Sequence, residues 1–203
     1  MIRARAVLVW AAFGAALAVP LGVAATSPLL AWRDPIYILA GFAGIVALAL
    51  MLVQPLLVGG YLPGIARRRG RRLHGWVGLG LVVAVVVHVA GLWLTSPPDV
   101  VDALLFTSPT LFSGWGVVAM WAVFLAALLA AMRWRLKIKP WVWRLAHTAL
   151  ALVIVVGSVV HALLIEGTMG PVSKAVLCLL VALALAKVVL DLRTWALLRR
   201  LRL

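Results

Sequence analysis

The chain has few of the charged side chains on which soluble domains depend. Only five of its 203 residues are acidic and 12% are charged, whereas 66% are hydrophobic. Soluble domains carry about 25% charged residues, so this composition excludes an ordinary soluble domain and is typical of a polytopic membrane protein. The net charge of +14 comes from basic clusters between apolar stretches, which indicates membrane topology and argues against nucleic-acid binding.

Cysteine is almost absent as well. The single cysteine, Cys178, lies inside an apolar stretch. One cysteine excludes an intramolecular disulfide and an iron–sulfur cluster held by several thiolates. The sequence also contains no glycine-rich dinucleotide-binding fingerprint. We therefore expect no catalytic residues and no flavin or nicotinamide site of that kind in these 203 residues.

What the chain does have is six apolar stretches of membrane-spanning length. They predict an all-α, polytopic membrane protein with one domain over residues 1–203. We place the six transmembrane helices at residues 6–25, 35–58, 74–94, 111–132, 141–165 and 172–192. A turn is expected over residues 59–64, which are rich in glycine and proline.

The first stretch has two interpretations. Arg3 and Arg5 precede an apolar run that ends in small residues, a pattern that also fits a cleaved signal peptide. The run is longer than the usual apolar region of a signal peptide, which favours a retained helix. The orientation of the other helices is the same in both cases.

Basic residues predict that orientation. Sixteen of the nineteen lie before the first stretch, between the second and third, between the fourth and fifth or just inside the fifth, or after the sixth. The loops at the other side hold Arg33 and Lys174 together with four of the five acidic residues. The positive-inside rule then places both termini in the cytoplasm. Lys187 and Asp191 are spaced to form an i,i+4 ion pair near the inner end of the last helix.

All four histidines lie in two of the apolar stretches, with equal spacing. His74 and His88 are fourteen residues apart in the third, and His147 and His161 are fourteen apart in the fifth. Fourteen residues span about 21 Å and just under four helical turns, so each helix presents its two histidines on nearly one face. Both helices run outward from the cytoplasm. The expected pairs are therefore His74 with His147 at the inner side and His88 with His161 at the outer side.

Two facing histidine pairs at two depths are the ligand geometry of two stacked haems, because each iron takes one axial imidazole from each helix. The four histidines are therefore the candidate axial ligands. A non-haem metal or a proton-transfer role is the alternative, since ionisable groups at membrane depth are costly and usually functional. Zinc or copper transport would need Cys, Met, Asp or Glu beside the histidines, and these helices offer none at suitable positions.

Small and basic residues near the histidines also have two interpretations each. Gly78, Gly91, Ala151 and Gly157 lie three or four residues from a histidine, where they leave room either for a flat porphyrin or for close helix packing. Basic side chains within one turn of the inner histidines can pair with haem propionates or serve topology and lipid headgroups; these are Arg71, Arg72 and Arg144.

The sequence around the histidines resembles a family. Arg-Arg-Leu-His74-Gly-Trp with His88, followed by Trp-Arg-Leu-Ala-His147 with His161, is similar to the ferric reductase-like transmembrane domain, the haem-bearing membrane part of ferric reductases and NADPH oxidases. The resemblance implies two b-type haems ligated by these four histidines. It also implies electron flow from a cytosolic donor to an outer acceptor.

The full-length enzymes of that family also carry a flavin and nicotinamide domain. Because no such domain follows the sixth stretch here, the chain is similar in size to stand-alone bacterial members. We expect a subunit of a membrane oxidoreductase in a bacterial inner membrane. Its electron donor would be a separate flavin reductase or a membrane quinol, and its acceptor would lie outside the cytoplasm.

Two other functions remain open. The first is a diheme cytochrome b of the quinone-linked or b561-like kind, which would be favoured by ligands spread over four helices. The second is a small membrane transporter or assembly factor with structural histidines, which would bind no haem.

Overall fold

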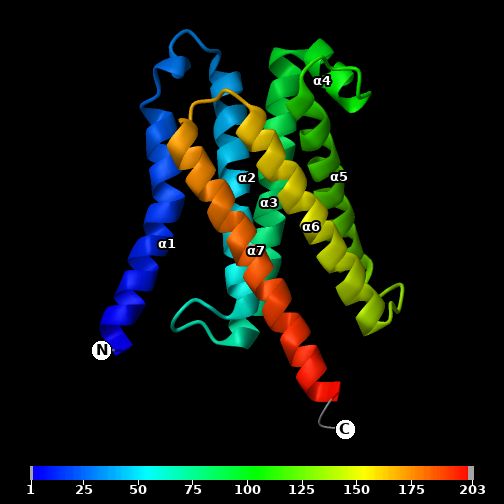
Figure 1. Ribbon diagram of the computed structural model, residues 1–203. Helices are drawn as coiled ribbons and strands as arrows, with labels where there is room; N and C mark the ends of the chain where they lie inside the picture. The colour runs from blue at the N-terminus through cyan, green and yellow to red at the C-terminus, as the bar shows by residue number, and fades with distance from the viewer. Residues whose placement is uncertain (1, 201–203) are drawn as a thin grey trace.

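Seven α-helices and one short 3₁₀ helix make up the described part of the chain (Figure 1). The computed structural model describes residues 2–200, and the side chains of residues 4–191. Within this part there is no β-strand, which confirms the all-α expectation. The elements are α1 (Ile2–Ala25), η1 (Pro28–Leu30), α2 (Pro35–Gly59), α3 (Arg67–Thr95), α4 (Pro97–Leu104), α5 (Leu111–Met132), α6 (Pro140–Leu164) and α7 (Pro171–Arg200).

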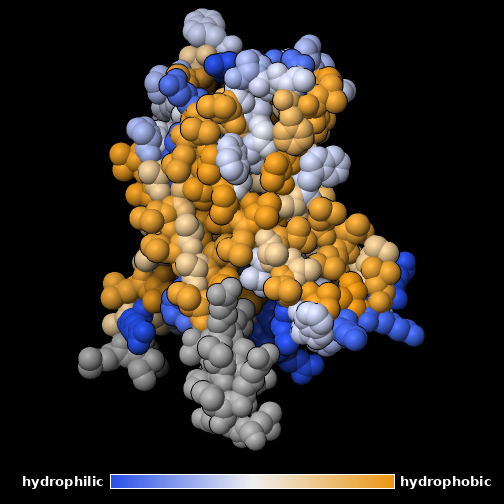
Figure 2. Space-filling view, turned by 45° about the vertical axis from the view of Figure 1, so that its right-hand side comes forward, coloured by the Kyte–Doolittle hydropathy of each residue, from blue (hydrophilic) through white to orange (hydrophobic). Residues whose placement is uncertain are grey.

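Six of the described helices are long and apolar enough to cross a membrane, as expected. They are α1, α2, α3, α5, α6 and α7, and in Figure 2 a broad apolar band separates two more polar ends. The boundaries differ in three main places. Helix α1 begins at Ile2, four residues before the expected start. Helix α3 starts at Arg67, seven residues before the expected start, because the arginine-rich segment is itself helical, and α7 continues to Arg200. The short helix α4 was not expected.

Local sequence signals explain where α2 begins and ends. Asp34 caps its first turn, where the carboxylate accepts the Ile36 N–H at 2.7 Å, and Pro35 occupies the first helical position. At the other end Gly60 has φ 70°, a left-handed conformation that suits glycine. The expected turn over residues 59–64 is therefore present.

The bundle consists of two helical hairpins held together by α7. Helix α2 packs along α3, and α5 packs along α6. Helix α7 contacts both α2 and α6, whereas α1 lies at the margin, against α2 and α7 (Figure 1). The most deeply buried side chains of α7, Leu177 and Val181, belong to the same core as Leu48 and Leu52 of α2. Helices α3 and α6 pack mainly against α2 and α5, not against each other.

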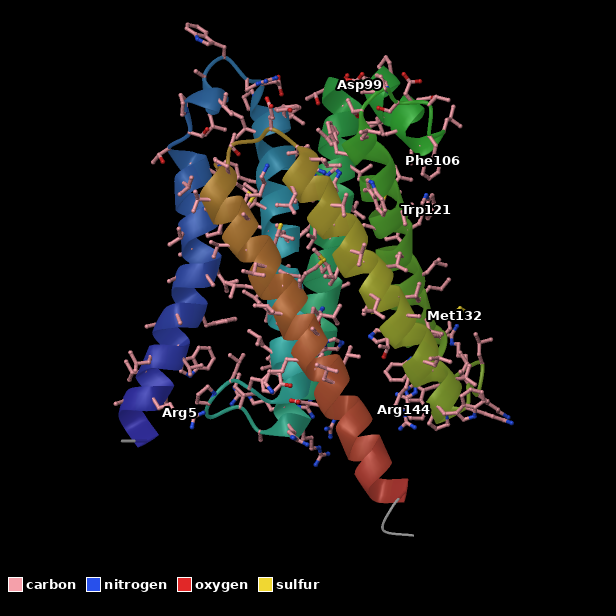
Figure 3. The ribbon with its side chains drawn as sticks, in the orientation of Figure 1. Arg5, Asp99, Phe106, Trp121, Met132 and Arg144 are labelled. Atoms are coloured by element: carbon pink, nitrogen blue, oxygen red, sulfur yellow. The ribbon has the colours of Figure 1, made fainter. Side chains whose placement is uncertain are left out.

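The two ends of the bundle carry opposite charge. Helix α1 begins and α7 ends at the same end of the molecule (Figure 1), and Arg5 and Arg144 lie there as well (Figure 3). Asp99 of α4 lies at the opposite end (Figure 3). We call these the basic end (residues 59–72 and 133–144) and the acidic end (residues 26–34, 96–110 and 165–170). That the basic end faces the cytoplasm stays a prediction.

Candidate functional site

The four histidines meet in two pairs between α3 and α6. The ring centres of His74 and His147 are 6.1 Å apart, and those of His88 and His161 are 6.4 Å apart. The first pair is nearer the basic end and the second nearer the acidic end, because both helices run from the basic end to the acidic end. The structure thus brings together the same partners that the equal fourteen-residue spacing predicts.

These separations suit a metal between the rings of each pair. A metal–imidazole bond is about 2 Å long and the ring centre lies about 1.1 Å beyond the nitrogen, so two imidazoles on opposite sides of one metal have centres about 6 Å apart. The ring planes are inclined by 75° and 80°. That angle is free in such an arrangement, since each ring can rotate about its own metal–nitrogen bond.

The pair near the acidic end is held by main-chain carbonyls. His88 Nδ1 lies 2.7 Å from the Ala40 oxygen in α2, and His161 Nδ1 lies 2.8 Å from the Phe112 oxygen in α5. A carbonyl can only accept, so both Nδ1 atoms carry the hydrogen and donate it. Nε2 is then left with a free lone pair, which is the tautomer that binds a metal through Nε2.

Two glycines make these short hydrogen bonds possible. A Cβ on Gly44 would lie 3.0 Å from His88 Nδ1, and one on Gly116 would lie 2.7 Å from His161 Nδ1. Each glycine follows its acceptor carbonyl by four residues, so its own N–H points at the same oxygen in the helix. Without a Cβ, the imidazole can reach the second lone pair of that oxygen. We call this arrangement the carbonyl–glycine unit (Ala40 with Gly44, and Phe112 with Gly116).

The pair near the basic end lacks such units. His74 Nδ1 is 3.4 Å from the main-chain oxygen of Gln54, a long contact, and the Gln54 side-chain amide lies beside the same nitrogen. If Nδ1 carries the hydrogen, the amide oxygen faces it; if Nδ1 carries none, the amide nitrogen faces it and donates. The amide orientation and the histidine tautomer are therefore linked. His147 Nδ1 is buried without a hydrogen-bond partner.

An aromatic stack takes the place of a hydrogen bond at His147. The Trp143 ring lies parallel to the His147 ring, with centres 5.1 Å apart and an interplanar angle of 11°. The Arg133 guanidinium lies 4.3 Å from the centre of the Trp143 ring. This cation–π contact and the stacking orient His147 without an acceptor for its N–H.

The two hairpins repeat one another around the histidines. The histidines of α3 and α6 are offset by 73 residues, and the carbonyl–glycine units of α2 and α5 by 72. Sequence reasoning missed Gly44 and Gly116, because the histidine offset of 73 residues does not match the offset of 72 between these glycines, and only the contacts connect them to the histidines. The repeat fails near the basic end, where Ala126 stands at the position in α5 that corresponds to Gln54.

The glycines singled out beside the histidines serve helix packing. A Cβ on Gly91 would lie 2.8 Å from the Ala40 Cβ, and one on Gly157 would lie 3.0 Å from the Trp115 oxygen. Gly78 faces the Gln54 amide, which would be 3.2 Å from an added Cβ. Of the two interpretations, close contact within each hairpin is therefore the one that the contacts support for these three residues.

The donor set at each pair suits haem better than a bare metal ion. Among the described residues no group of three or more His, Cys, Asp or Glu side chains could hold a metal ion. Two imidazoles alone would leave a zinc ion short of its usual four ligands. A porphyrin brings four nitrogens of its own, so that two axial imidazoles complete its iron.

Comparison with known proteins gives a family match. The family described as "Ferric reductase like transmembrane component" matches residues 40–158, which is more than half of the chain. The match includes three of the four histidines and ends three residues before His161. Among curated proteins and solved structures, none matches the chain. Domains of this family are haem-binding in general and serve electron transfer in membranes with redox partners. The chain therefore belongs to the ferric reductase-like transmembrane family and is an integral, multi-pass membrane protein.

Proposed function

We propose that the chain is a membrane cytochrome b that holds two haems and passes electrons from a donor on the cytosolic side to an acceptor on the outer side. The observation that carries the proposal is the pairing of His74 with His147 and of His88 with His161 at 6.1 and 6.4 Å between ring centres. Haem b bound at each pair would supply one-electron redox chemistry.

The chain contributes ligands, orientation and an apolar surrounding. The four histidines would hold the haem irons, two side chains to each haem, and would leave no coordination position for a substrate. Ala40 and Phe112 fix the ring orientation at the acidic end through their carbonyls. Exposed arginines at the basic end are available to pair with propionate carboxylates; these are Arg71, Arg72 and Arg144.

The ligand distribution also bears on the first alternative. All four histidines are on α3 and α6, whereas a b561-like arrangement would draw ligands from four helices. The two-helix arrangement favours the ferric reductase-like function. The donor, either a separate flavin reductase or a membrane quinol, and the outer acceptor belong to this proposal as expectations.

The test is a haem count on the purified protein. In mild detergent, the dithionite-reduced minus oxidised absorbance spectrum should show a b-type signal, and the pyridine haemochrome assay should give about two haems per chain. Replacing one ligand, as in His88→Ala or His147→Ala, should reduce the count to about one, because one axial bond is lost at one site only.

Leu145→Ala is the matched control for His147→Ala. Leu145 lies two residues before His147 on α6 and is 65% exposed, so this variant should keep both haems. A colourless protein after expression with sufficient haem would overturn the proposal in favour of a transporter or assembly factor. An unchanged count in both histidine variants would show that these residues are not the ligands.

A further inference from the structure

The two histidine pairs differ in how strongly the protein polarises their rings. At the acidic end both rings donate short hydrogen bonds, 2.7 and 2.8 Å long, to main-chain carbonyls. At the basic end one ring has a 3.4 Å contact and the other has no acceptor. The donor strength of an imidazole rises when its other N–H is hydrogen-bonded, so the acidic-end pair is the more electron-donating one.

The cause of the difference lies in α2 and α5. The carbonyl–glycine unit requires a glycine four residues after the acceptor, and Gly44 and Gly116 provide it. Four residues after Gln54 stands Val58, and four after Ala126 stands Ala130. Both positions carry a Cβ where Gly44 and Gly116 have none, so each hairpin has the unit at one end only.

Charge acts in the same direction. His161 lies in the last turn of α6, where the helix dipole is negative. His74 and His147 are each the eighth residue of their helix and lie nearer the basic end. Ten basic residues lie within residues 59–72 and 133–144, and no acidic ones do. Four of the five acidic residues lie at the acidic end.

On the basis of the proposed function, we infer that the carbonyl–glycine units make the His88–His161 site the lower-potential site, and that the first electron entering the protein resides at the His74–His147 site. Stronger ligand donation stabilises ferric over ferrous iron and lowers the potential. Positive charge favours the added electron and raises the potential at the other site. Gly44 and Gly116 are thus positioning residues for the histidines, with an electronic effect.

The experiment is a potentiometric titration of the full chain in detergent, followed by absorbance. The His161→Ala variant retains the basic-end site, and His147→Ala retains the acidic-end site. Each remaining haem should give one reduction wave in the titration. We expect the wave of His161→Ala to lie at a higher potential than the wave of His147→Ala. The reverse order would overturn the inference.

Gly44→Ala tests the carbonyl–glycine unit itself. Its Cβ would sit 3.0 Å from His88 Nδ1, so the ring must move by a few tenths of an ångström and its bond to Ala40 lengthens. We expect the lower wave to shift upward and the higher wave to stay. Gly41→Ala is the matched control on the same helix, since its Cβ would meet nothing within 4 Å, and it should move neither wave.

Gln54→Leu probes the other site. It removes the amide beside His74 and leaves both carbonyl–glycine units intact, so the lower wave should stay where it is. Two haems per chain with a lower wave that Gly44→Ala does not move would overturn the inference and leave the proposed function intact. The haem count is measured before the titration. A protein without haem would overturn both the proposed function and this inference, and the count identifies that case.

Discussion

At the scale of single residues, Tyr61 connects two distant parts of the chain. Its hydroxyl donates to the Asp191 carboxylate, 130 residues away in α7. Lys187 donates to the same carboxylate at 3.0 Å, which confirms the expected i,i+4 pair, and its Nζ lies 4.9 Å from the centre of the Tyr61 ring. The ion pair itself is exposed, so it contributes little to stability. The cluster instead ties the loop between α2 and α3 to α7.

The phenol of Tyr61 should ionise at a higher pH than an ordinary tyrosine. Desolvation and the hydrogen bond to Asp191 raise its pKa from 10.0 to about 12. Since the folded state favours the neutral phenol, its contribution to stability is complete below pH 10 and is lost as the pH rises toward 12. An ultraviolet titration of the chain minus that of Tyr61→Phe should show one phenol ionising near pH 12.

The chain has only two tyrosines, so this difference spectrum isolates one residue. The control is Tyr37→Phe, which should leave the transition near pH 12 in place. A Tyr61 transition near pH 10 would show that the contact with Asp191 does not form.

At the scale of helices, each hairpin contains a close approach beside a histidine. Gly91 of α3 meets Ala40 of α2, and Gly157 of α6 meets the Trp115 carbonyl of α5. Ala40 is also the residue whose carbonyl accepts from His88, and Trp115 directly precedes Gly116. Helix packing and histidine orientation are therefore set by the same contacts.

Gly91→Ala should weaken both packing and the acidic-end site. The new Cβ would lie 2.8 Å from the Ala40 Cβ and 3.3 Å from the Ile36 oxygen, so α2 and α3 must separate. Overpacking of this kind costs roughly 1–3 kcal/mol. We expect a lower midpoint of thermal unfolding in detergent and fewer haems per chain.

Gly80→Ala is the control on the same helix. Its Cβ would make only an ordinary contact, 3.7 Å from Leu50 Cδ1, so its effect on unfolding should stay within about 0.5 kcal/mol. Equal melting of the two variants would mean that the Gly91–Ala40 approach is not what holds the hairpin.

At the scale of the whole molecule, charge is segregated along the bundle axis. The basic end contains both loops that close the hairpins, and the acidic end contains α4 and the connection from α6 to α7 (Figure 1). The two histidine pairs lie one behind the other along this axis. Because the helices cross an even number of times, α1 begins and α7 ends at the same end.

Cysteine labelling should show that the basic end is cytoplasmic. Cys178 is 1% exposed and can be replaced by alanine to give a background without cysteine. In that background, Glu166→Cys should react with a membrane-impermeant maleimide added to intact spheroplasts, and Arg135→Cys should react only after lysis. The opposite labelling pattern would reverse the direction of electron flow that we propose.

The sequence by itself determined the spans, the charge segregation and the pairing of the histidines by depth. Each of these depends on local properties: the length of an apolar run, the basic residues beside it, or a fourteen-residue spacing along one helix. The family resemblance also followed from residues around the four histidines, and the match over residues 40–158 confirmed it.

Only the tertiary structure decided how the histidines are held. The acceptors of His88 and His161 lie 48 and 49 residues away, on helices that carry no histidine. Which carbonyl an imidazole reaches depends on how α2 packs on α3 and α5 on α6, and helical periodicity carries no such information. For the same reason the difference between the two pairs, with Gln54 beside one histidine and Trp143 stacked on another, became visible only in the folded chain.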